Sequence, residues 1–150
     1  TNYILTKMFE ENMDFKTALA KATELGYAEA DPTADVEGLD AGRKAAILSS
    51  IAFHSRVQFK DVYTEGITKI TAEDIAYAKE FDCVIKLLAV AHNTDKGIGS
   101  GSVSGAAWKE HPLSSVRDSF NAVFVHGDAV MMRCFTEEVP GDADGKCCCR

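Results

Sequence analysis

The stretch GYAEADPTADVEGLDAGRKAA, residues 26–46, joins two segments of helical periodicity through an acidic loop. Before the loop, apolar residues recur at helical spacing over residues 13–25, and Gly26 follows them as a C-terminal stop. After the loop, the same period predicts a helix from Asp40 to about His54. Its apolar positions are Ala41, Ala45, Leu48, Ile51 and Ala52. Five carboxylates therefore lie within twelve positions between two helices: Glu29, Asp31, Asp35, Glu37 and Asp40.

Asp40 and Lys44 stand four residues apart at the start of the second predicted helix, so they share one face and can pair. Asp40 also occupies the positive end of the helix dipole. The proline and glycine of the loop limit its flexibility and allow a turn, so Glu29 and Asp35 can point toward this pair. Carboxylates hold an ammonium group, and a lysine that acidic neighbours keep charged can give a proton to an oxyanion. The pattern suits a zwitterionic substrate.

Plainer interpretations stay open for the same residues. An acidic loop before a helix is usually a solvated connection with a capping residue, and an Asp–Lys surface pair contributes only a few tenths of a kcal/mol. The ligand spacing and central glycine of an EF-hand calcium loop are absent. The histidines also lack metal-ligand spacing and receive no role: His54, His92, His111 and His126. We predict no metal site.

Composition limits the classes of partner. A chain of 150 residues with 46% hydrophobic content fits one domain with one core. The net charge of −7 would repel phosphates, so we expect no nucleic acid and no anionic membrane surface as partner. No apolar run reaches the ~20 residues of a membrane helix. The N-terminus lacks the order of a signal peptide, and five cysteines show no disulfide or zinc pattern. We expect a cytoplasmic protein with a small-molecule partner.

The rest of the chain alternates between helical and extended patterns. Thr71 and Asp74 resemble a capping box that opens a helix over residues 72–81. The glycine- and serine-rich residues 93–108 read as a loop. Three segments have the composition of strands: residues 61–70, 83–92 and 121–130. The pattern predicts an α+β fold with a mixed/antiparallel β-sheet and helices packed on one face.

Several segments, in this order and spacing, resemble the catalytic, substrate-binding domain of homoserine dehydrogenase. They are TNYILTKM (1–8), GYAEADPTADVEGLDAGRKAAIL (26–48), EGITKITAEDIAYAKEFDCVIKLLAVA (65–91), HPLSSV (111–116) and NAVFVHGDAV (121–130). The resemblance implies an oxidoreductase that interconverts L-homoserine and L-aspartate 4-semialdehyde with NADP or NAD, on the route to threonine and methionine. It also implies a homodimer for the intact enzyme.

The resemblance assigns roles to five residues. The family residue that matches Lys44 moves the proton at the C4 oxygen of the substrate, and the one that matches Asp40 supports it. The residue that matches Glu29 holds the substrate's amino group, and those that match Tyr27 and Asp35 complete the pocket. The family binds its dinucleotide mainly through a Rossmann domain, which nothing in this sequence matches. The resemblance therefore implies no cofactor-binding residue here.

We expect residues 1–130 to be the catalytic domain, truncated at its N-terminus, and residues 131–150 to be a tail that departs from the family. Shifted codon readings of residues 99–108 and 131–150 can encode family-like motifs, so we hypothesise that small insertions or deletions scrambled both segments, with poor packing in the tail. A genuine tail of unknown use is the alternative. We expect the chain alone to be inactive. An amino-acid-binding module and a non-functional gene fragment remain alternatives to a catalytic piece.

Overall fold

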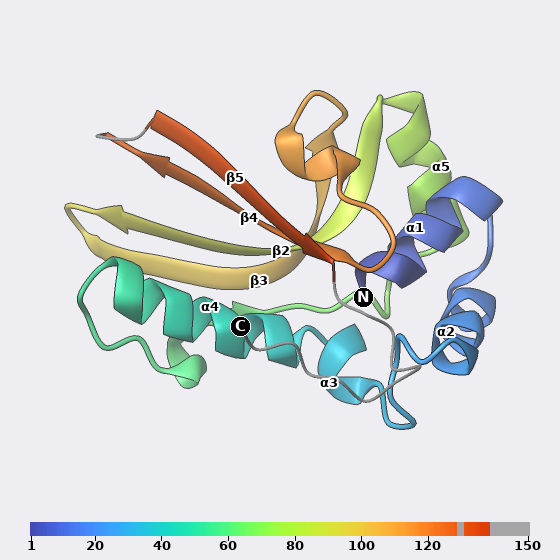
Figure 1. Ribbon diagram of the computed structural model, residues 1–150, viewed down its shortest axis with the longest axis horizontal. Helices are drawn as coiled ribbons and strands as arrows, with labels where there is room; N and C mark the ends of the chain where they lie inside the picture. The colour runs from blue at the N-terminus through green and yellow to red at the C-terminus, as the bar shows by residue number, and fades with distance from the viewer. Residues whose placement is uncertain (129–130, 139–150) are drawn as a thin grey trace. The chain divides into compact units, whose positions relative to one another are not determined.

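The computed structural model describes residues 1–128 and 131–138 (Figure 1). Its backbone divides into two units. The first unit comprises Thr1 with residues 31–70 and 86–105. The second comprises residues 2–30 and 71–85 with the described residues from 106 onward.

The elements form an α+β arrangement, as the sequence predicts. The helices are α1 (Asn2–Glu11), α2 (Phe15–Glu24), α3 (Thr33–Val36), α4 (Leu39–Ala52) and α5 (Ala72–Glu80), with the 3-10 helices η1 (Phe59–Asp61) and η2 (Pro112–Ser115). The strands are β1 (Tyr63–Thr64), β2 (Cys83–Thr94), β3 (Gly97–Trp108), β4 (Phe120–Gly127) and β5 (Met131–Glu138).

The first unit is built on a mixed sheet with strand order β1-β3-β2. Strand β1 pairs parallel with β3, and the two-residue turn between β2 and β3 makes that pair antiparallel. Helix α4 runs beside β3 (Figure 1), where Ser49 Oγ lies 3.1 Å from Ser100 Oγ. Beneath α4, a buried apolar cluster consists of Ala45, Ala46 and Val62. One face of this sheet is therefore covered by the helix that carries Asp40 and Lys44.

Close contact between α4 and β1 depends on a small residue. A side chain at Gly42 would meet Thr64 Oγ1 at 2.7 Å and the Phe59 ring at 2.9 Å. A Cβ at this position would require the side chains of Thr64 and Phe59 to move. Gly42 therefore lets these two side chains pack directly against α4.

The second unit packs α1 against α2 and α5. The apolar residues of α1 are almost fully buried, and α2 and α5 contribute small side chains to the same core. These core residues are Tyr3, Ile4, Leu5, Met8, Ala18, Ala22, Ile75 and Ala78. Strands β4 and β5 pair antiparallel, from Phe120 opposite Glu138 to Gly127 opposite Met131. Asn2 Nδ2 donates to Phe120 O at 3.0 Å, which ties the start of α1 to β4.

Three predicted helices are confirmed as α2, α4 and α5. The capping box is also present, because Thr71 N donates to Asp74 Oδ2 at 2.8 Å and Asp74 N donates to Thr71 Oγ1 at 3.2 Å. The strands predicted at residues 83–92 and 121–130 correspond to β2 and β4, with residues 129–130 outside the described part of the chain.

The loop predicted at residues 93–108 is wrong, because residues 97–108 form strand β3. The strand pairs with β1 on one side and β2 on the other, so its backbone hydrogen bonds offset the conformational entropy that its glycines lose. The predicted insertion or deletion at residues 99–108 concerns the origin of the sequence, which backbone pairing does not test.

The strand predicted at residues 61–70 is wrong for most of its length, because only Tyr63–Thr64 is extended and paired. Residues after Thr64 turn instead, and Ile67 N donates to Val36 O at 2.7 Å rather than to a neighbouring strand. The sequence pattern also left α1 unassigned.

Part of the predicted tail forms regular structure. Residues 131–138 are strand β5, on which the side chains of Met131, Met132 and Phe135 are exposed. Residues 139–150, which include the triple cysteine at positions 147–149, lie outside the described residues. Within the described chain, every helix is too short or too polar to cross a bilayer.

Candidate active site

Gly38 sets the start of α4. Its φ of 74° lies in the left-handed region, and a Cβ there would sit 3.1 Å from Glu65 O. Both the backbone conformation and the space favour glycine. The helix then begins at Leu39, which places Asp40 in its first turn, where the helix dipole stabilises a negative charge.

Asp40 and Lys44 form the ion pair that their spacing predicts. Lys44 Nζ lies 2.6 Å from Asp40 Oδ2, and the two side chains are 65% and 43% exposed. An ion pair this accessible adds little to folding stability. What it does provide is a solvent-accessible ammonium group whose position is set by a carboxylate on the same helix face. Such a group can exchange a proton with a substrate oxygen that comes within hydrogen-bond reach.

Asp35 on α3 lies near the same point. Burial lowers the pKa of the Thr1 α-amino group, whereas the charges of Asp35 and Asp40 raise it and that of Lys44 lowers it. These three side chains are thus close enough to act electrostatically on one nitrogen. The structure brings Asp35, Asp40 and Lys44 together within the first unit, and the two carboxylates there favour a positive charge.

Tyr27 and Glu29 belong to the second unit. The ring centroid of Tyr27 lies 4.7 Å from that of the buried Tyr3 of α1, so aromatic packing orients its side chain. Glu29 is an exposed carboxylate two residues later. These two predicted pocket residues therefore lie in the same unit as α1, and the Asp40–Lys44 pair belongs to the other unit.

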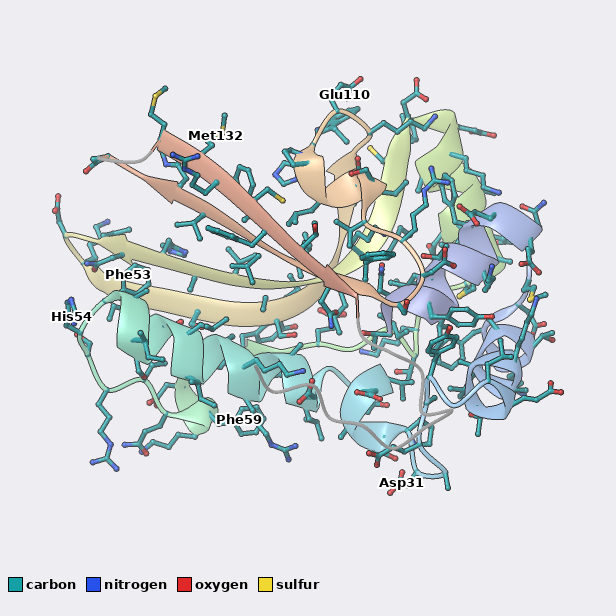
Figure 2. All side chains as sticks on the ribbon, viewed as in Figure 1. Asp31, Phe53, His54, Phe59, Glu110 and Met132 are labelled. Carbon is teal, nitrogen blue, oxygen red and sulfur yellow. The ribbon has the colours of Figure 1, made fainter. Side chains whose placement is uncertain are left out.

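The neighbouring charges of the loop have local partners. Asp31, labelled in Figure 2, accepts hydrogen bonds from Thr33 N at 3.1 Å and Thr33 Oγ1 at 2.6 Å. These bonds lower the pKa of Asp31. The guanidinium of Arg43 lies 5.5 Å from the centroid of the Phe59 ring, also labelled in Figure 2. Asp31 thus has a structural role in the turn before α3, and Arg43 packs on η1 beside the ion pair.

Sequence reasoning missed one segment that touches this site. Residues 65–67 lie against the junction of α3 and α4, where Ile67 is fully buried. The signal was Gly66, a glycine inside a run of β-branched residues, which is typical of close backbone approach rather than of a plain strand.

Among the described residues, no group of three or more His, Cys, Asp or Glu side chains is arranged so that it could hold a metal ion. His111 instead accepts a hydrogen bond from Leu113 N at its Nδ1, at 3.2 Å, and its ring centroid lies 5.1 Å from that of Phe124. That histidine therefore serves the turn at η2 and its packing on β4.

The homoserine dehydrogenase family model matches residues 1–144, which includes part of the segment for which a departure from the family is predicted. The homoserine dehydrogenase of Mycobacterium tuberculosis strain H37Rv is 49% identical over 148 residues, which cover 95% of this chain and 34% of that protein. That of Corynebacterium glutamicum is 51% identical over 134 residues, covering 86% of this chain and 30% of that protein.

Solved structures give the same result. The crystal structure of S. aureus homoserine dehydrogenase at pH 6.0 superposes with a TM-score of 0.90 at 38% identity, covering 93% of this chain and 36% of that one. The enzyme from Thiobacillus denitrificans gives a TM-score of 0.89 at 41% identity, covering 93% and 32%. The chain thus spans about a third of the length of the curated relatives it matches. The sequence match, the fold and the start of α4 agree that this chain belongs to the homoserine dehydrogenase family.

Proposed function

We propose that this chain is the catalytic, substrate-binding part of an enzyme that interconverts L-homoserine and L-aspartate 4-semialdehyde with NADP or NAD, in threonine and methionine biosynthesis. The observation that carries the proposal is the accessible Asp40–Lys44 ion pair in the first turns of α4, within a chain of this family. The relatives are about three times longer than the chain, so the activity belongs to the whole enzyme and this part supplies the proton and the substrate pocket.

The chemistry follows from the charge that the reaction creates. Reduction of the aldehyde leaves an alkoxide at the C4 oxygen, and the Lys44 ammonium group gives it a proton. In the reverse direction the neutral Lys44 amine takes the proton from the C4 hydroxyl. Asp40, 2.6 Å from Lys44 Nζ, orients this nitrogen through the ion pair. Lys44 is thus the proposed general acid and base, and Asp40 its supporting residue.

The substrate's own ammonium group needs carboxylates. Asp35 and Asp40 both favour a positive charge at the Thr1 nitrogen, which supports a role for Asp35 in the pocket. Glu29 supplies an exposed carboxylate, and Tyr27 is oriented by Tyr3. We assign Glu29 to the substrate's amino group, with Tyr27 and Asp35 as further pocket residues.

The described residues do not fit a dinucleotide. Phosphate cradles of this kind use a glycine-rich turn between a strand and a helix N-terminus, whereas the glycines at residues 97–105 lie inside strand β3. We therefore place NADP or NAD mainly on a domain outside this chain and assign no cofactor-binding residue here.

Two further properties belong to the proposal. One face of the β4–β5 pair exposes several apolar side chains, which supports a homodimer of the intact enzyme. These side chains are Val123, Val125, Met131 and Phe135, with the exposed Arg133 among them. The described cysteines, Cys83 and Cys134, are free thiols, which supports a cytoplasmic location.

The test uses a completed enzyme, in which this chain replaces the matching third of the Corynebacterium glutamicum relative. We expect homoserine-dependent reduction of NADP or NAD, and a rate lower by a factor on the order of a hundred for 4-hydroxybutyrate, which lacks the amino group. Glu29→Ala should raise the KM for homoserine at least about tenfold. A folded completed enzyme that binds homoserine but never reduces the dinucleotide would instead favour a binding module.

A further inference from the structure

Residues Glu65–Ile67, here termed the brace, connect the sheet of the first unit to the turn between α3 and α4. Glu65 N donates to Ser102 O on strand β3 at 2.7 Å, and Ile67 N donates to Val36 O at 2.7 Å. Ile67 is fully buried beside this contact. The brace is therefore held at one end by the sheet and at the other by the junction that lies between Asp35 and Asp40.

The middle residue of the brace touches the junction backbone directly. A Cβ on Gly66 would lie 2.1 Å from Val36 O and 2.4 Å from Glu37 Cα. Gly66 is not among the glycines with a positive φ, so a left-handed backbone is not the reason for glycine here. Close approach is therefore the property that requires glycine at this position.

The contact continues on the other side of the junction. Gly38, which opens α4 with a φ of 74°, comes so close to Glu65 O that its own Cβ would lie 3.1 Å from that oxygen. The brace thus borders the junction at Val36, Glu37 and Gly38. Asp40 follows Gly38 by two residues. The position at which the brace contacts the junction therefore sets where the first turn of α4 begins.

We propose that Gly66 is a positioning residue for the Asp40–Lys44 pair, an inference that rests on the proposed function. By letting the brace lie directly on the α3–α4 junction, Gly66 fixes the origin of α4 and with it the location of Lys44 Nζ. A side chain at position 66 would force the two backbones apart by about 1 Å to reach ordinary contact distances. A misplacement of that size at a reacting group can cost on the order of a hundredfold in rate.

The test is a double-mutant cycle on kcat in the completed enzyme. We expect Gly66→Ala to lower kcat between about tenfold and a hundredfold in the Lys44 background. In the Lys44→Ala background, the same substitution should lower kcat by less than about threefold, because the group that it displaces is already gone. Equal losses in both backgrounds would show a general structural defect and would overturn the proposal.

Gly105→Ala is the matched control, because a Cβ at Gly105 on strand β3 has no atom within 4 Å. Its kcat should stay within about twofold of the parent. Far-ultraviolet circular dichroism and the urea midpoint establish that each variant is folded. If Gly66→Ala does not fold, Gly38→Ala replaces it, with an expected fall in kcat of about three- to tenfold that also vanishes without Lys44. A folded Gly38→Ala enzyme with parental kcat would then overturn the proposal.

The double-mutant cycle distinguishes failure of the proposed function from failure of the positioning role of Gly66. Lys44→Ala alone tests the proposed function, since loss of a general acid must lower kcat. If Lys44→Ala lowers kcat strongly while folded Gly66→Ala leaves it unchanged, the proposed function stands and only the positioning role is overturned. If Lys44→Ala leaves kcat unchanged, the proposed function is overturned, and the positioning role with it.

Discussion

The ion pair between Asp40 and Lys44 does not by itself indicate a function, because its surroundings decide whether it has one. Spacing of i and i+4 on a helix predicts the contact, and the 2.6 Å separation confirms it. The same geometry occurs in many solvated surface pairs of no functional consequence. What distinguishes this pair is its place at the first turn of α4, directly after the helix α3 that carries Asp35.

We predict that Asp40→Asn lowers kcat of the completed enzyme about tenfold while the KM for homoserine changes less than threefold. The variant loses the ion pair that positions Lys44 Nζ, whereas the carboxylates proposed to hold the substrate, Glu29 among them, are unchanged. Steady-state kinetics with homoserine measure both constants.

Asp31→Asn is the matched control, because its carboxylate bonds to Thr33 rather than to Lys44. We expect both of its kinetic constants to stay within about twofold of the parent. An equal loss of kcat in the two variants would assign the effect to the charge of the loop instead of to the ion pair.

At the scale of elements, capping explains where α5 begins. The Thr71 backbone N–H and hydroxyl both donate to the Asp74 carboxylate and hold the pKa of Asp74 below its ordinary value. A carboxyl whose pKa is lower in the folded chain stabilises it above the ordinary pKa and loses that contribution as pH falls through the folded value. The free energy of unfolding should therefore fall as the pH is lowered below about 4, in part because the contribution of this cap is lost.

We predict that Thr71→Ala lowers the free energy of unfolding of the chain by about 1 kcal/mol near pH 7, the usual cost of a lost N-cap. The difference between Thr71→Ala and the parent should shrink as the pH falls below about 4, because protonation of Asp74 removes its hydrogen bond from the Thr71 hydroxyl. Urea titrations at several pH values measure it, and a difference that does not change with pH would contradict the role of Asp74.

Helices were predictable from the sequence because their signals are local. The apolar period of α2, α4 and α5, the stop at Gly26 and the box at Thr71 all lie within a few residues of the elements they define. Asp40 and Lys44 could be identified together for the same reason. The turn residues of the loop also suggested that Glu29 points toward this pair, whereas Tyr27 was assigned a role only through the resemblance to the family.

Strand β3 was missed and the strand that contains β1 was predicted too long, because their structure depends on partners far along the chain. Residues 97–105 are rich in glycine and serine, and they are extended because β1 and β2 pair with both edges. The residues after Thr64 looked extended, but Ile67 N bonds to Val36, some thirty positions earlier. The positioning role of Gly66 is therefore visible only in the folded chain.

At the scale of the whole molecule, we predict that this 150-residue chain on its own shows no saturable NADPH binding and no homoserine oxidation. The described residues supply Lys44 and its carboxylates but no phosphate-cradling turn, and one proton donor without a positioned hydride carrier gives no turnover. Fluorescence titration with NADPH tests the binding. Saturation at micromolar NADPH would contradict the placement of the cofactor on another domain.

A second whole-molecule prediction concerns the origin of residues 99–108 and 131–150. If insertions or deletions produced them, the source DNA read in a shifted frame should encode family-like sequence in both segments. Resequencing that DNA decides the question. Nucleotides for residues 131–150 that yield no family sequence in either shifted frame would favour a genuine tail.

The central claim is that Lys44 moves the proton at the C4 oxygen, and the kcat of Lys44→Ala in the completed enzyme tests it most directly. The side chain is 65% exposed, so its removal should change the free energy of unfolding by less than about 0.5 kcal/mol. We predict that kcat falls by a factor on the order of a hundred or more, the size expected for loss of the group that moves this proton. A folded Lys44→Ala enzyme that turns over homoserine at the parental rate would contradict the account.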